Sequence, residues 1–292
     1  MSWRIVSVAS LSKLDYKMDY LVVRNRETTT RIHLSEISIL LLESTAVSLT
    51  AYLLRELERR KIDVIFCDEK RMPYAMLASL YGSHDTALRY REQAGWTREN
   101  CNIVWAEIVK QKIRGQIEVL PKEKSKEKKL LESYLPQIQP GDASNREGHA
   151  AKVYFNALFG MDFSRSAETP VNAALNYGYG LLLSAQAREV IACGYCTQLG
   201  IFHRNRFNRL NLASDLMEPF RPFIDARVRD LELKTFGKEE KHEMIAVLNR
   251  VLSIEGKQQF FLTALRLYTR SVLQALSTGE VSSICFSLYE EL

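Results

Sequence analysis

Long apolar runs are absent from this sequence of 292 residues. The apolar runs that it has, such as ISILLL at 37–42, are far shorter than the roughly 20 residues that a membrane-spanning helix needs. The chain also does not open on a basic segment followed by an apolar one, which is the pattern of a secretion signal. We therefore expect a soluble, cytoplasmic protein with no membrane partner.

Cysteine is scarce, and its five positions do not suggest disulfide bonds. An odd number of scattered cysteines, in a chain of this size, is typical of reduced thiols. Cys193 and Cys196 form a Cys-x-x-Cys motif, but no second pair accompanies it and no thioredoxin-like βαβ pattern surrounds it. Buried structural thiols are the favoured interpretation, with a zinc or redox role as the alternative.

A strong excess of charge of either sign is missing as well. The net charge of +5, with a pI near 8.9, permits a polyanionic partner without requiring one. Hydrophobic residues make up 46% of the chain, which at this length is enough to bury the cores of two domains.

The first part of the chain contains short β-rich runs separated by polar turns. One helix is predicted among them at 47–61, where Leu49, Leu53 and Leu57 recur at helical spacing. We expect a small sheet or sandwich in a domain covering residues 1–83. The five predicted strands are WRIVSV, YLVVR, TRIHL, ISILLLE and DVIFC.

After about residue 84 the apolar spacing becomes that of helices, and strand-like runs are rare. The Lys-rich segment PKEKSKEKK at 121–129 is typical of a solvated loop or helix end. We predict a larger all-α domain at 84–292, and therefore an α+β chain. The predicted helices are 101–113, 149–159, 172–192 and 241–276.

The stretch SNREGHA at 144–150 has two interpretations. Ser144 and Glu147 match a capping box, in which both side chains satisfy free amides of the first helical turn. Gly148 weakens this interpretation, because glycine inside a helix costs about 0.5–1 kcal/mol relative to alanine. It suggests that another group packs closely there. A chemical role of Glu147 is therefore the second interpretation.

Two further segments carry polar groups of the same kind. His203 ends the stretch TQLGIFH, where a partly buried histidine near a helix C-terminus is the simpler interpretation. In NLASDLMEPFRP, Asp215 and Glu218 lie one helical turn apart, which by itself describes a solvated acidic face. Pro219 must kink or end the preceding turn, so these carboxylates are placed at an irregular point of the chain.

Together these segments supply two or three carboxylates and one imidazole, a donor set that suits Mg²⁺ or Mn²⁺ better than a structural zinc. Arginine side chains near such a metal fit a phosphodiester substrate, because the guanidinium group binds the backbone while the metal polarises the reacting phosphate. A charged helical surface is the alternative. The surrounding polar residues are Asn145, Arg146, Lys152, Arg165, Arg204, Asn205, Arg206, Asn208, Arg209, Arg221, Arg227 and Arg229.

At these residues the chain resembles the CRISPR-associated integrase family, the catalytic subunit of the spacer-acquisition complex (CRISPR-associated protein one). The similarity is greatest to the type II variant, from systems with a single large RNA-guided effector nuclease, and it covers nearly the whole chain. The matching segments are HLSEISILLLE, VIFCDEKRMP, SNREGHAAKVYFNALFG, LNYGYGLLLS, REVIACGYCTQLGIFH and FNRLNLASDLMEPFRP.

The resemblance implies an N-terminal β-sandwich domain, a larger all-α catalytic domain, and a homodimer formed largely through the smaller domains. The catalytic and metal-binding trio of the family maps onto Glu147 in REG, His203 in GIFH and Glu218 in DLMEPF. Many relatives carry aspartate at the position of Glu218. Asp215 is a further candidate metal ligand of lower rank.

The implied reaction is a transesterification on double-stranded DNA with Mg²⁺ or Mn²⁺ as cofactor. A prespacer 3′-hydroxyl attacks a phosphodiester at the border of a CRISPR repeat. The implied partners are a small ferredoxin-fold protein (CRISPR-associated protein two), a ring-shaped accessory protein and the large effector nuclease. Tyr177 and Tyr179 either stack on a base or belong to the core. The DNA-binding candidates are Arg146, Lys152, Arg165, Arg204, Asn205 and Arg206.

Two alternatives stay open. The same trio in a metal-dependent nuclease or resolvase would hydrolyse phosphodiesters with water as the nucleophile. A non-catalytic nucleic-acid-binding scaffold would bind DNA in the presence of EDTA and leave its covalent structure unchanged.

Overall fold

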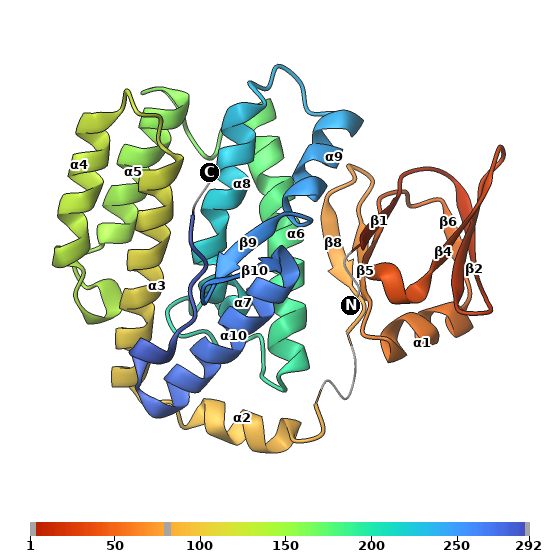
Figure 1. The fold of residues 1–292 in the computed structure, drawn as a ribbon, viewed down its shortest axis with the longest axis horizontal. Coiled ribbons are helices and arrows are strands. Elements are labelled where there is room, and N and C mark those ends of the chain that lie inside the picture. The colour runs from red at the N-terminus through yellow and green to blue at the C-terminus, as the bar shows by residue number, and fades with distance from the viewer. Residues whose placement is uncertain (1–3, 79–82, 290–292) are drawn as a thin grey trace. The chain divides into compact units, whose positions relative to one another are not determined.

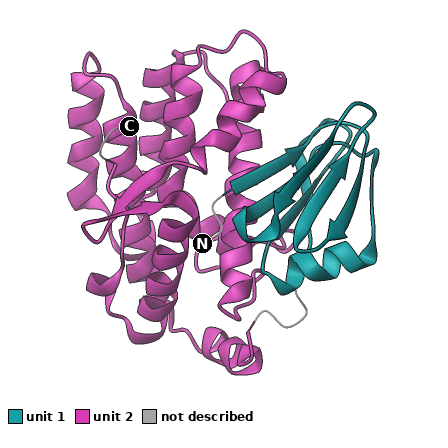
Figure 2. Ribbon diagram, turned by 45° about the vertical axis from the view of Figure 1, so that its right-hand side comes forward, with its two compact units in different colours: residues 1–82 teal, residues 83–292 magenta. Residues whose placement is uncertain are grey.

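The chain folds as two units, residues 1–82 and residues 83–292 (Figure 2). A computed structural model describes residues 4–78 and 83–289.

The first unit contains two four-stranded sheets. In the first, β5 pairs in parallel with β1 and β7, and β8 pairs antiparallel to β7. In the second, β3 pairs antiparallel to β2 and β4, and β6 pairs in parallel with β2. The first sheet consists of β1 (Arg4–Val8), β5 (Ile37–Leu42), β7 (Asp63–Cys67) and β8 (Pro73–Met76). The second consists of β2 (Ser12–Lys17), β3 (Tyr20–Arg24), β4 (Thr29–His33) and β6 (Val47–Leu49).

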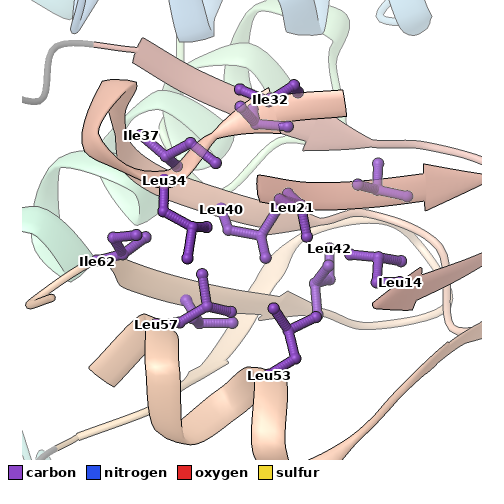
Figure 3. Packing of buried hydrophobic residues seen from close by; sticks show 13 residues of the cluster. Leu14, Leu21, Ile32, Leu34, Ile37, Leu40, Leu42, Leu53, Leu57 and Ile62 are labelled. Carbon is purple, nitrogen blue, oxygen red and sulfur yellow. The ribbon is translucent and has the colours of Figure 1, made fainter. Parts of the chain in front are cut away.

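One hydrophobic core joins the two sheets (Figure 3). Leu14 and Leu21 of the second sheet and Leu40 of the first are fully buried in it. Helix α1 (Ala51–Arg59) adds Leu53 to the same cluster. Sheets that share a core in this way form a sandwich, as expected, and the α+β fold class is confirmed.

The sequence-based prediction missed β2, β6 and β8, which are short or partly polar. It also began the helix too early. The Thr50 side chain accepts a hydrogen bond from Leu53 N (3.2 Å) and caps α1 there, while Val47–Leu49 pairs with β2 as strand β6.

The second unit is mostly helical, and α3, α4 and α5 lie side by side in it (Figure 1). Helix α3 also packs against α8 and α10, and α6 against α7 to α10. The α-helices are α2 (Thr86–Ala94), α3 (Arg98–Val119), α4 (Ser125–Tyr134), α5 (Arg146–Phe159), α6 (Pro170–Ala192), α7 (Asn211–Leu216), α8 (Arg221–Asp230), α9 (Lys238–Val247) and α10 (Phe261–Thr278). Short 3₁₀ turns are η1 (Leu34–Glu36) in the first unit and η2 (Leu135–Gln137), η3 (Pro140–Asp142), η4 (Glu218–Phe220) and η5 (Val281–Ser283) in the second.

A continuous helix at 241–276 is wrong, because a hairpin of β9 (Val251–Ile254) and β10 (Lys257–Phe260) separates α9 from α10. The second unit is therefore not purely helical. Glu255 and Gly256 form the two-residue turn of the hairpin, and both have positive φ, 51° and 70°. Within the described residues, no helix is long and apolar enough to span a membrane.

Candidate metal and nucleic-acid site

Glu147 lies in the first turn of α5, which begins after an unusual cap. Asn145 is in the left-handed conformation (φ 50°), and its side chain accepts a hydrogen bond from Gly148 N (3.3 Å). The Asp142 carboxylate accepts from Arg146 N and Glu147 N, at 2.8 and 2.9 Å. These two side chains satisfy the free amides at the start of the helix.

The capping-box interpretation of Ser144 and Glu147, one of the two considered, is therefore wrong. The Ser144 hydroxyl donates to Gln137 O instead (3.3 Å), and the Glu147 carboxylate is not used in the cap. The close packing expected at Gly148 comes from Asn145, whose Oδ1 would lie 2.7 Å from an added Cβ.

Glu218 is the first residue of η4, the 3₁₀ turn between α7 and α8. Pro219 follows it, and α7 ends at Leu216, so the kink expected from the proline is present. The Glu218 side chain is 3% exposed, and its Oε1 lies 2.9 Å from Arg221 Nε. The turn aims a carboxylate into the interior of the unit.

Lys112 of α3 joins the two glutamates. Its Nζ lies 2.6 Å from Glu147 Oε1 and 2.5 Å from Glu218 Oε2. The contact with Glu218 is an ion pair between two buried side chains. Carboxylates from α5 and η4 thus converge on one cation supplied by α3.

The charges of this cluster stabilise one another. Burial opposes a charge on Lys112, but the Glu218 and Glu147 carboxylates outweigh it and raise the pKa of the ammonium group. Burial likewise opposes a charge on Glu218, but Arg221 and Lys112 lower the pKa of its carboxyl group. Both groups are therefore charged near neutral pH.

His203 is held in the loop between α6 and α7 by Asp215, which is fully buried. Asp215 Oδ1 accepts from His203 N (3.0 Å) and lies 2.5 Å from the ring Nδ1. Its Oδ2 accepts from Ile201 N and Phe202 N, at 2.7 and 3.0 Å. Because a carboxylate can only accept, the imidazole donates through Nδ1, and Nε2 takes no part in these contacts.

The hydrogen bond with Asp215 raises the pKa of the His203 imidazole, and burial opposes this effect. The charges of Asp215, Glu218 and Glu147 raise the pKa further. His203 is therefore within electrostatic reach of both glutamates. In the described parts of the chain, no group of three or more His, Cys, Asp or Glu side chains lies close enough together to hold a metal ion.

A cationic pocket of about 470 Å³ opens beside His203. Three of the DNA-binding candidates, Arg204, Asn205 and Arg206, line it. Its other lining residues are Trp96, Arg98, Cys101, Gln198, Leu199, Gly200, Asn208, Arg209 and Asn211. A pocket with four arginines and no acid among its described lining residues suits an anionic ligand.

The other three DNA-binding candidates lie outside this pocket. Lys152 is exposed on α5. The Arg146 guanidinium lies over the Tyr134 ring, 5.2 Å from its centre. Arg165 donates to Asn172 and Asn176, at 2.5 and 2.7 Å.

The two tyrosines considered for base stacking belong to the core. Tyr177 is fully buried and Tyr179 is 8% exposed. The hydroxyls of Tyr179 and Tyr154 donate to Asp225, whose burial raises the pKa of its carboxyl group to about 6.

All five cysteines are free thiols, and Cys67 is the buried one. Cys196 Sγ donates to Gln198 Oε1 (2.8 Å). Burial raises the pKa of the Cys193 thiol.

Comparison with known proteins decides the family. The family of CRISPR associated protein Cas1 matches residues 7–263. The chain is 32% identical over 266 residues to the CRISPR-associated endonuclease Cas1 of Neisseria meningitidis serogroup C (strain 8013), which covers 89% of this chain and 87% of that protein. The chain belongs to the Cas1 family.

Solved structures share the fold of this Cas1 family member. A casposase bound to integration product aligns with a TM-score of 0.75 and 17% identity over 96% of this chain and 92% of that chain. A chain of a Cas6-RT-Cas1–Cas2 complex aligns with a TM-score of 0.76 and 18% identity over 99% of this chain. This chain spans only 36% of that longer chain.

Membership in the Cas1 family confirms the resemblance seen in the sequence. It also confirms the prediction of an enzyme of the CRISPR-associated endonuclease class. The narrower assignment to type II systems and the roles of individual site residues stay predictions.

The sequence-based prediction missed Lys112, the residue on which the glutamates converge. A signal was present, because Lys112 follows Ile108 and Val109 at helical spacing on the apolar face of α3. A charged residue at such a position is buried only when it is paired.

Proposed function

We propose that this protein is a metal-dependent DNA integrase of CRISPR adaptation, which joins prespacer 3′-hydroxyl ends to the borders of a CRISPR repeat by transesterification. The observation that carries the proposal is the convergence of Glu147 and Glu218 on one cation, with His203 in electrostatic reach, in a member of the Cas1 family.

The donor set fits Mg²⁺ or Mn²⁺, since two carboxylates already surround a cation and an imidazole nitrogen is available. Glu147, Glu218 and His203 Nε2 would hold the ion. When bound, it would lower the pKa of the attacking hydroxyl and offset charge on the phosphate. Both oxygens of Asp215 are engaged with the His203 loop, so we assign Asp215 to orienting the imidazole rather than to binding metal.

The arginine-lined pocket beside His203 is proposed to hold the DNA backbone next to the reacting phosphate. Arg204, Asn205 and Arg206 are the leading candidates because they line it. Arg146, Lys152 and Arg165 are ranked below them. Arginine suits this task because its planar fork binds two phosphate oxygens at once.

The proposed assembly is a homodimer that binds double-stranded DNA together with a small Cas2 partner. The Cas1–Cas2 complex named for one structural relative supports this partner. Contacts with a ring-shaped accessory protein and with a large effector nuclease, and a cytoplasmic location, are further parts of the proposal.

A joining assay tests the proposed reaction. Purified protein, its Cas2 partner and Mn²⁺ should join labelled 3′-hydroxyl prespacer ends to a repeat-containing duplex. Glu147→Gln and His203→Ala should each lower joining by a factor of at least about 100, because each removes a metal ligand. Lys126→Gln, at an exposed position of α4, serves as the control; joining at the wild-type rate in both site variants would overturn the proposal.

The runner-up is hydrolysis of phosphodiesters by the same trio, which the name of the Neisseria relative favours. Cut product without joined product would support it. Binding of DNA that is unaffected by EDTA, with no covalent change in the DNA, would indicate a scaffold.

A further inference from the structure

Lys112 is a buried lysine whose ammonium group lies between two acidic side chains of the candidate site. We propose that it is a built-in counter-cation, which holds Glu147 and Glu218 together in the metal-free protein and must leave them before a divalent ion binds. The inference rests on the proposed metal ligands.

The distances exclude simultaneous occupation of this space. Lys112 Nζ is 2.6 Å from Glu147 Oε1 and 2.5 Å from Glu218 Oε2. A Mg²⁺ ion bound by the same two oxygens would lie about 2.1 Å from each. The Lys112 ammonium group and a metal ion that binds these two oxygens therefore compete for one position.

The energetics explain why a cation is needed there without metal. Glu218 is 3% exposed, and two neighbouring carboxylates repel each other strongly where water is scarce. Lys112 removes this repulsion because α3 places its side chain between α5 and η4. The ion pairs thereby preserve the arrangement of the ligands when no metal is bound.

Arg221 has a different position and provides a charge-matched comparison. Its Nε contacts Glu218 through Oε1, at 2.9 Å, while Lys112 contacts Oε2. No contact joins Arg221 to Glu147 among the ion pairs of the described residues. Arg221 can therefore stay in place when a metal ion binds between the two glutamates.

The test measures Mn²⁺ affinity of the full chain by electron paramagnetic resonance, without DNA and without turnover. Lys112→Gln should bind Mn²⁺ about tenfold more tightly than the wild type, because no ammonium group has to be displaced. Arg221→Gln should change the affinity by less. Lys110→Gln, two residues away on α3 and paired with Glu107, should leave it unchanged.

Thermal unfolding gives a second, independent measurement. In EDTA, Lys112→Gln should melt at a lower temperature than the wild type, because the two carboxylates lose their shared cation. Added Mn²⁺ should raise its melting temperature by more than that of the wild type. If Lys112→Gln does not fold in EDTA, the charge-preserving Lys112→Arg is measured instead, and it should bind Mn²⁺ no more tightly than the wild type.

Glu147→Gln separates the failure of this inference from that of the proposed function. If it leaves Mn²⁺ affinity unchanged, Glu147 is not a ligand and the proposed site itself fails. If it weakens Mn²⁺ binding while Lys112→Gln binds Mn²⁺ like the wild type or more weakly, only the competition by Lys112 is overturned.

Discussion

At the scale of single residues, the environment of each acid decides what it does. Asp215 and Glu218 are three positions apart in the sequence and look alike there. Asp215 is fully buried and accepts from three backbone amides and the His203 ring, which fixes the loop that carries the imidazole. Glu218 instead faces the cations Lys112 and Arg221. The contacts of Asp215 therefore lie within the His203 loop, whereas those of Glu218 are with cationic side chains of α3 and α8.

The proposed ligand role of His203 predicts how metal binding depends on pH. Asp215 raises the pKa of the imidazole above its ordinary value of 6.5, and only the neutral ring can bind a metal ion. Mn²⁺ affinity, measured by titration calorimetry between pH 5 and 9, should therefore fall as the pH is lowered, with a midpoint above 6.5.

The matched variant is Asp215→Asn, in which the midpoint should move to lower pH because the carboxylate charge is gone.

Folding stability depends on pH in the opposite direction from metal affinity. The charged His203–Asp215 pair stabilises the protein fully below the unfolded pKa near 6.5. That contribution is lost as the pH rises through the higher folded pKa. Affinity that is flat from pH 9 to pH 5 would contradict a ligand role for His203.

At the scale of elements, close packing of α3 positions the site. Gly115 lies one turn after Lys112, and an added Cβ would lie 2.5 Å from Tyr289 Cζ and 2.7 Å from Pro222 Cγ. Pro222 belongs to α8, so the missing side chain allows α3 and α8 to approach each other.

Gly115→Ala should therefore destabilise the protein despite the better helix propensity of alanine. The expected loss is about 1–2 kcal/mol, since overpacking costs about 1–3 kcal/mol and alanine regains up to about 1 kcal/mol. Urea unfolding measures the change. Gly95→Ala is the control, because a Cβ there makes only ordinary contacts at 3.4 and 3.5 Å; equal stabilities of the two variants would contradict the packing argument.

The elements also show where sequence patterns were sufficient. Helices α3, α5 and α6 contain the predicted ranges, because apolar residues that recur every 3.6 residues over a long stretch indicate a helix and rarely another structure. The hairpin of β9 and β10 was missed, because strands of four residues are too short for their period to stand out between two helices. The Glu255–Gly256 turn was the available signal.

At the scale of the whole molecule, a modest net charge is distributed unevenly. The chain has 40 basic and 35 acidic residues, yet the pocket beside His203 is lined by four arginines and no acid. Binding to DNA should therefore depend on this pocket more than on the total charge.

The salt dependence of DNA binding tests this distribution. Replacing Arg204 and Arg206 together by alanine should reduce the slope of log K against log salt concentration by about 2, since each phosphate contact contributes about 0.9. Fluorescence anisotropy with a duplex at several salt concentrations measures the slope. Lys126 and Lys128, replaced together in the Lys-rich segment, lose the same charge and should leave the slope nearly unchanged. Equal losses in the two double variants would indicate that only total charge matters.

The α+β fold class, most of the long helices and the three segments that carry the candidate acids and imidazole could be predicted from the order of the amino acids alone. These properties depend on local periodicity, on turn chemistry and on motifs that stand in the sequence as continuous stretches. The partners of each acid depend on the tertiary structure, because packing of α3, η4 and the loop before α7 brings Asp215 to the His203 loop and Glu218 to Lys112. The contacts of a buried charge depend on groups that folding brings close in space. The number of residues between two such groups in the sequence does not indicate how far apart they lie in the folded protein.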